Sequence, residues 1–179
     1  MIKFFIKDTE MIEWVISVLK STPSSWLSLA EFLPAELSRQ KPLPSEWSTV
    51  ECLQHLVDTE RVFTLRVEAF MAGKDFAAFN PDTQGSRPGE KTLAELAGEL
   101  ARSREDNLEQ LARLHPQDLE RKVRHQELGM VSLNEMLHEW AAHDLNHTIQ
   151  AERALMQPFI RSSGPWQPSF SDHIVKPKT

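Results

Sequence analysis

The chain has 179 residues, enough for one domain with a full hydrophobic core. Hydrophobic residues make up 40% of it and charged residues 26%, as in soluble globular proteins, and no apolar run approaches the ~20 residues of a membrane span. The formal net charge of −6, without a basic patch that interleaves with aromatic residues, excludes nucleic acid as an expected partner.

The only cysteine, Cys52, excludes an intramolecular disulfide framework. It lies near an apolar helical stripe, where a small buried side chain is a more common role than a nucleophile. The segment from Met1 to Ser21 carries charges throughout and lacks a small-residue cleavage site, so we expect no signal peptide and a cytoplasmic location.

The first predicted helix begins near Asp8 or Thr9, either of which can serve as the N-cap. Thr22 followed by Pro23 is typical of a fresh N-cap and first helical position, and apolar residues continue beyond them to Phe32. The sequence therefore predicts either one long helix with a kink at Pro23 or two short helices in succession.

The second predicted helix is capped by Ser45 or Ser48 and ends at Gly73, a residue that favours the left-handed conformation at a helix terminus. Its apolar residues recur with the helical period. Glu60 falls in the middle of this apolar stripe, and His55 lies at its edge.

A long connection from Gly73 to Gly89 leads to the third predicted helix, Glu90 to Leu114. The connection is longer than an antiparallel helical hairpin needs, and it can run the length of a bundle. We therefore expect the helices on either side to lie parallel, in an all-α four-helix bundle with a crossover between helices 2 and 3. Arg104 and Asn107 interrupt the apolar face of the third helix.

Residues 116 to 131 are expected to form a connector without strands. The last predicted helix then begins at Ser132, which forms a capping box with Glu135, and it ends near Met156. From Pro158 onward the chain is rich in proline and serine. We expect residues 1–157 to form the bundle and residues 158–179 an extended tail that packs on it or trails from it.

Histidines provide the candidate metal site. His143 and His147 stand four residues apart in the last helix, so their imidazoles point the same way and can reach one ion. Zinc-like ions usually take at least three protein ligands, and His55 is the third candidate. The simpler interpretation is that each is a hydrogen-bonded core histidine. The histidines expected at the surface are His115, His125, His138 and His173.

Three charged residues on apolar faces also need partners, because burying an unpaired charge is costly. They are Glu60, Arg104 and Asp144. A structural ion network is the favoured interpretation. As an alternative, the carboxylates accept the second ring N–H of a metal-binding histidine, or one of them serves as a general base.

The chain resembles the DinB/YfiT-like superfamily, particularly its DinB_2-type members, from about Thr22 to Leu155. The similar segments are Thr22-Pro23, Glu46-Trp47-Ser48 with Glu51, His55-Leu56, Glu60-Arg61-Val62-Phe63, Arg104, His125-Gln-Glu-Leu-Gly129, and His143-Asp-Leu-Asn-His147 ahead of Gln150. The resemblance implies a bundle with up-down-down-up order and a divalent metal held by His55, His143 and His147.

Characterised members of this superfamily include thiol-dependent transferases and isomerases that use bacillithiol, mycothiol or glutathione. The resemblance therefore implies a metal-dependent enzyme that activates a thiol or water toward a small-molecule substrate, with zinc or nickel as the metal and iron or manganese as alternatives. It also implies a homodimer. No catalytic residue is assigned. The alternative is a non-catalytic, stress-related bundle that binds a metal or a small ligand.

Overall fold

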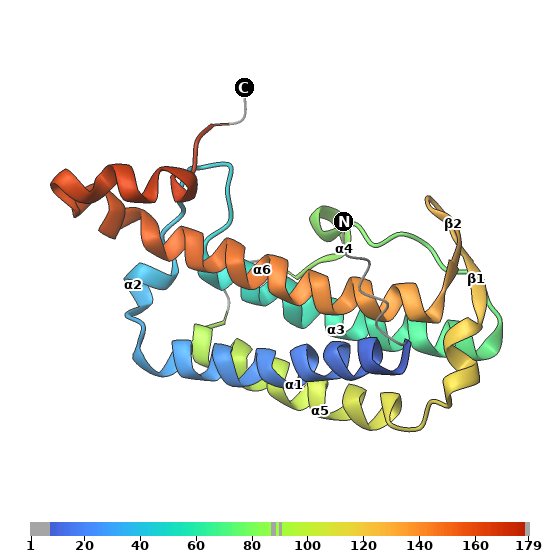
Figure 1. The fold of residues 1–179 in the computed structure, drawn as a ribbon. Coiled ribbons are helices and arrows are strands. Elements are labelled where there is room, and N and C mark those ends of the chain that lie inside the picture. The colour runs from blue at the N-terminus through green and yellow to red at the C-terminus, as the bar shows by residue number, and fades with distance from the viewer. Residues whose placement is uncertain (1–7, 87–88, 90, 178–179) are drawn as a thin grey trace.

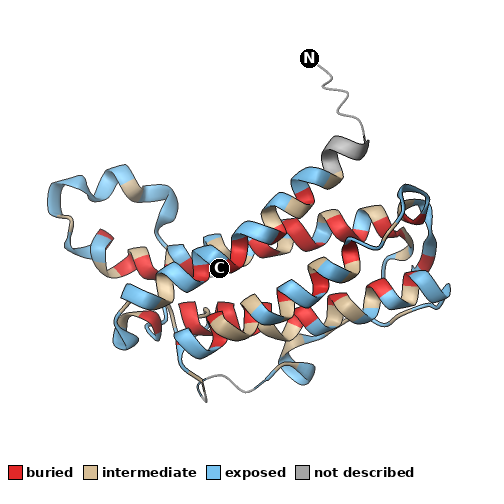
Figure 2. Ribbon diagram, turned by 90° about the horizontal axis from the view of Figure 1, so that it is seen from below, coloured by how far each residue is buried: buried red, intermediate tan, exposed pale blue. Residues whose placement is uncertain are grey.

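Four long helices lie side by side in this computed structural model, which describes residues 8–86, 89 and 91–177. They are α1 (Asp8–Phe32), α3 (Thr49–Ala72), α5 (Leu93–Leu111) and α6 (Leu133–Ser162). Helices α1 and α3 each contact both α5 and α6, and buried residues line the sides that face the interior (Figure 2). Because α1 and α6 run one way and α3 and α5 the other, the predicted up-down-down-up order is confirmed (Figure 1).

The connection between α3 and α5 is the predicted crossover. Gly73 ends α3 with a positive φ of 63°, and the chain then passes through the short helix α4 (Pro81–Gln84) on its way to α5. Helix α5 begins at Leu93, where Thr92 forms a capping box with Glu95. The predicted start of this helix, Glu90, lies outside the described residues.

Helix α1 is one continuous helix despite Pro23, which settles the choice left open by the sequence. Proline has no N–H, so the carbonyl four residues earlier, that of Leu19, loses its helical donor. The side chain of Arg104 replaces that donor, with Nη1 2.8 Å from the Leu19 carbonyl oxygen. Asp8 and Thr9 are already helical, and the residues before them lie outside the described chain.

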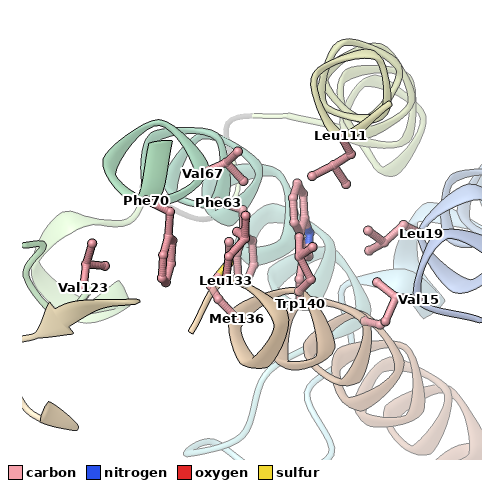
Figure 3. Packing of buried hydrophobic residues seen from close by; sticks show 12 residues of the cluster. Val15, Leu19, Phe63, Val67, Phe70, Leu111, Val123, Leu133, Met136 and Trp140 are labelled. Carbon is pink, nitrogen blue, oxygen red and sulfur yellow. The ribbon is translucent and has the colours of Figure 1, made fainter. Parts of the chain in front are cut away.

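The core contains two clusters of buried side chains. The first gathers residues from the four long helices around Trp140, whose ring stacks on Phe63 with centroids 4.5 Å apart (Figure 3). The second surrounds Trp26 and includes Cys52, which is fully buried. Cys52 is therefore a core residue, as predicted, and burial raises the pKa of its thiol to about 12.

The connector before α6 contains a short 3-10 helix, η1 (Pro116–Glu120), and two strands that the sequence did not predict. Strands β1 (Lys122–His125) and β2 (Gly129–Ser132) form an antiparallel hairpin. Each strand has only four residues, too few for a clear alternating pattern. The prediction that His125 lies at the surface is wrong, because its ring is buried and its Nδ1 accepts hydrogen bonds from the next turn.

Helix α6 continues through Pro158 to Ser162, beyond its predicted end at Met156. The following residues form a 3-10 helix, η2 (Gly164–His173), rather than an extended tail, and η2 folds back beside the end of α6 (Figure 1). The Gln157 side chain fixes the end of η2 against α6: it donates to the His173 carbonyl and accepts from the Val175 amide. In the described part of the chain, no helix is both long and apolar enough to cross a membrane.

Candidate metal centre

His55 is positioned by the start of α3. Ser48 caps this helix and forms a capping box with Glu51, which also pairs with Lys41 at 2.7 Å. His55 follows one turn later and faces α6. The Thr49 hydroxyl donates to the Ala151 carbonyl of α6, which fixes the two helices against each other near the histidine.

His143 and His147 project from the middle of α6 toward His55. One nitrogen from each of the three rings lies within 4.8 Å of the other two. The Nε2 atoms of His55 and His143 are 3.0 Å apart. In the part of the chain that the structure describes, no fourth histidine, cysteine or carboxylate joins this group.

These donors fit a divalent metal ion. Nitrogen ligands about 2.0–2.1 Å from a tetrahedral zinc ion are about 3.3 Å from one another, close to the His55–His143 separation. The Nδ1 of His147 lies 2.8 Å from the Gln150 side-chain oxygen, an acceptor, so this nitrogen carries the proton. The lone pair of the His147 Nε2 is then available to a metal.

Electrostatics keep the three rings neutral, the form that binds a metal. Burial, together with the nearby His147, lowers the pKa of His55 from 6.5 to about 4. Burial and the two neighbouring imidazoles lower the pKa of His143 to about 3. The pKa of His147 is also lowered by burial, against the opposing effect of its hydrogen bond to Gln150.

Aromatic rings surround the histidines. Trp47 stacks on His147 with centroids 5.7 Å apart and also contacts His55. Phe79, from the crossover, stacks on His55 at 6.3 Å, and the edge of Phe63 meets His143. These rings cover the sides of the cluster and pack against the imidazoles.

A cleft of about 320 Å³ opens beside the three histidines. Besides the aromatic rings it is lined by Arg66 from α3 and Glu139 from α6, neither of which the sequence had indicated as a site residue. Glu139 stands one turn before His143, so helical spacing from the candidate ligands could have found it. Arg66 had no such signal in the sequence.

The ion network predicted for Glu60, Arg104 and Asp144 is present and fully buried. Arg104 binds both carboxylates, and Asn107 donates to Glu60. Burial raises the pKa of Asp144, and the Arg104 guanidinium opposes that rise. Both carboxylates bind Arg104 and make no hydrogen bond to the histidine rings within the described chain, so the alternative in which they accept a ring N–H is wrong. The general-base role stays a prediction.

The remaining histidines differ in exposure. His115 and His173 are exposed, as predicted. His138 was expected to face solvent, but it is half-buried, with Nδ1 2.8 Å from the Asn134 carbonyl oxygen of the preceding turn.

Fold and site together define a four-helix bundle with a crossover that gathers three histidines from two antiparallel helices beside a small cleft. A family model described as the DinB superfamily matches residues 19–151. The chain belongs to the DinB superfamily.

Two solved structures have a similar fold. One is YfiT from Bacillus subtilis, described as a probable metal-dependent hydrolase with an unusual four-helix bundle topology. Its TM-score is 0.69 and its sequence identity 15%, and the match covers 89% of this chain and 93% of the YfiT chain. The other is the DinB-like protein YjoA, also from Bacillus subtilis, with a TM-score of 0.57 and 19% identity over 82% of this chain and 92% of its own. No curated protein sequence matches this chain.

Proposed function

We propose that His55, His143 and His147 bind one divalent metal ion and that the protein is a metal-dependent enzyme acting on a small molecule. The observation that carries the proposal is the convergence of three neutral imidazoles, without a fourth protein ligand in the described chain, beside an open cleft. A structural zinc site is closed by four protein ligands, whereas a catalytic site keeps a position open. YfiT, a fold relative, is itself described as a probable metal-dependent hydrolase.

A bound divalent ion lowers the pKa of a coordinated water or thiol and so supplies hydroxide or thiolate near neutral pH. The protein's own residues prepare the site for this chemistry. Gln150 orients the His147 ring, and the rings of Trp47 and Phe79 limit access of bulk water. Partial burial at the cleft raises the pKa of Glu139, which suits this carboxylate to accept a proton from the nucleophile.

The proposal includes two reactions, hydrolysis with water as the nucleophile and transfer to a low-molecular-weight thiol. Zinc or nickel is the expected metal, with iron or manganese as alternatives; imidazole ligands suit several of these ions. A non-catalytic bundle that only stores a metal is less favoured, since such a site gains nothing from a ligand-sized cleft. A non-catalytic bundle that binds a small ligand is the alternative. The predicted homodimer remains a prediction.

The test is to load the protein with cobalt(II) and record its visible spectrum before and after adding azide or 2-mercaptoethanol. We expect both additions to change the spectrum, because an open coordination position exchanges ligands. A spectrum that neither addition alters would show a closed site and would favour the non-catalytic alternative. A response to azide without one to the thiol would favour hydrolysis over thiol transfer.

A further inference from the structure

The cleft holds an arginine whose hydrogen-bonding groups are unused. Arg66 lines the cleft beside the histidines, and its side chain is only 15% exposed. Its Nε is buried without a partner, and the guanidinium makes no hydrogen bond to any residue in the described chain. Its nearest anion is Glu139, 4.0 Å from Nη1, which is too long for a hydrogen bond.

Arg104, which is buried in the ion network, shows how a desolvated arginine normally uses its donors. Arg104 is 1% exposed, and it donates to Glu60, Asp144 and the Leu19 carbonyl. A guanidinium offers five N–H donors in a planar fork, and a desolvated one is normally satisfied in this way. Burial lowers the pKa of Arg66, against the opposing charge of Glu139, so the site favours a further anion.

The surroundings of Arg66 hold the guanidinium in place without using its donors. Its Cζ lies 5.6 Å from the Phe63 ring centroid and 5.3 Å from that of Phe76. Contacts with aromatic rings engage the faces of the guanidinium and leave the N–H edges available. Glu139 is 51% exposed and 4.0 Å from Nη1, so it competes only weakly with another anion for these donors.

From these contacts we propose that the cleft binds a small organic carboxylate, with the carboxylate on Arg66 and an apolar body against the ring of Phe79 and the side chain of Val62. Among the described residues that line the cleft, Arg66 is the only lysine or arginine, which suits a monoanion rather than a doubly charged phosphate. The planar fork matches a carboxylate in bidentate geometry. The volume, about 320 Å³, is at the small end for ligand sites.

This inference deepens the proposed function by naming a substrate class. When the three neutral histidines hold a divalent ion, the charges of Arg66 and Glu139 cancel and the site keeps the charge of the ion. An anionic substrate is then favoured at the metal as well as at the arginine. Arg66 and the three histidines line the same cleft, so one end of the substrate can bind Arg66 while the reacting end faces the histidines.

The test is an amide NMR titration of the protein, metal-free and zinc-loaded, with 3-phenylpropanoate and with its neutral analogue 3-phenylpropanamide. A charge-assisted hydrogen bond is worth roughly 1.5–3 kcal/mol, or about 10- to 150-fold in affinity. We expect the parent to prefer the carboxylate at least tenfold. Arg66→Met should abolish this preference while retaining amide binding, which also shows that the variant folds, and Arg66→Lys should restore part of it.

Two further variants sharpen the test. Arg102→Met removes one positive charge, as Arg66→Met does, but at an exposed position of α5. This variant should bind the carboxylate as the parent does. Glu139→Gln removes the competing anion and should tighten carboxylate binding severalfold. Equal affinity of the parent for the carboxylate and the amide, or an unchanged preference in Arg66→Met, would overturn the inference. Zinc content is measured separately. Because the metal-free titration does not depend on zinc, a failure to bind metal can be distinguished from a failure of Arg66 to bind the carboxylate.

Discussion

Arg104 donates from Nη1 to the main-chain carbonyl of Leu19, the group that Pro23 leaves without its helical donor. The same guanidinium binds Asp144 of α6 at 2.7 Å and Glu60 of α3. One side chain therefore connects the interrupted turn of α1 to the two helices that carry the histidines. Asp144 directly follows His143 and lies within the turn from His143 to His147, so this network also fixes the candidate metal centre.

Replacing Arg104 by methionine should destabilise the fold by roughly 3–5 kcal/mol, because two buried carboxylates and a buried carbonyl lose their partner. Urea denaturation followed by circular dichroism measures this change. Arg102→Met, at an exposed position of the same helix, should change the free energy of unfolding by no more than about 0.5 kcal/mol. Equal effects of the two substitutions would contradict the structural role of Arg104.

His147→Ala should remove most of the bound metal. Elemental analysis of protein purified without a nickel column should give about one first-row metal ion per chain in the parent and far less in the variant, since two imidazoles alone bind zinc-like ions poorly. His173→Ala, which removes an exposed histidine, is the matched control and should retain the metal. Equal metal content in the parent and His147→Ala would exclude His147 from the site.

Acid should destabilise the metal-free protein through the buried histidines. The pKa of His143 is about 3 in the folded state, against an ordinary value of 6.5. Between these two values the unfolded chain binds a proton that the folded protein does not, so stability falls as the pH falls. For this one group the slope is at most about 1.4 kcal/mol per pH unit.

Urea denaturation of the chelator-treated protein at several pH values from 7 to 4 measures this slope. His143→Leu should show a shallower loss of stability over the same range, whatever its stability at pH 7. The raised pKa of Asp144 acts in the opposite direction in both proteins and cancels from the comparison. Parallel curves for parent and variant would show that His143 is protonated as readily in the folded protein as in the unfolded chain.

Local sequence patterns predicted the main helices well, because caps and apolar periodicity are local properties. The ends of two helices lie where expected: α3 is capped by Ser48 and Gly73, and α6 begins after Ser132. The spacing of His143 and His147 likewise indicated one face of a helix. His55 was the third candidate because it lies at the edge of another helical apolar stripe, and the family resemblance implied the same three ligands.

Other parts of the site were not predictable from the sequence. Arg66 carries no local pattern, and its role appears only once the donors of every neighbouring residue are known. Phe79 reaches His55 from a crossover whose path no periodicity describes. The His147 partner, Gln150, lies one turn away and was accessible to helical spacing, but carboxylates were expected there instead.

The crossover is held over the site by Asp58. Its carboxylate accepts hydrogen bonds from the Ser86 amide at 2.8 Å and from the Ser86 hydroxyl at 2.6 Å. Between this anchor and the end of α3 lies Phe79, which stacks on His55. Asp58→Ala should therefore loosen the segment from residue 76 to residue 86 and uncover one side of the histidines.

Hydrogen exchange measured by mass spectrometry tests this prediction on the segment itself. Loss of two hydrogen bonds to a charged acceptor at a partly exposed site should cost about 1–2 kcal/mol, so exchange in residues 76–86 should be roughly tenfold faster. Asp82→Ala removes an exposed carboxylate from the same segment, where it makes no side-chain hydrogen bond to the described residues, and should exchange like the parent. Unchanged exchange in Asp58→Ala would mean that stacking of Phe79 alone is enough to hold the crossover over the site.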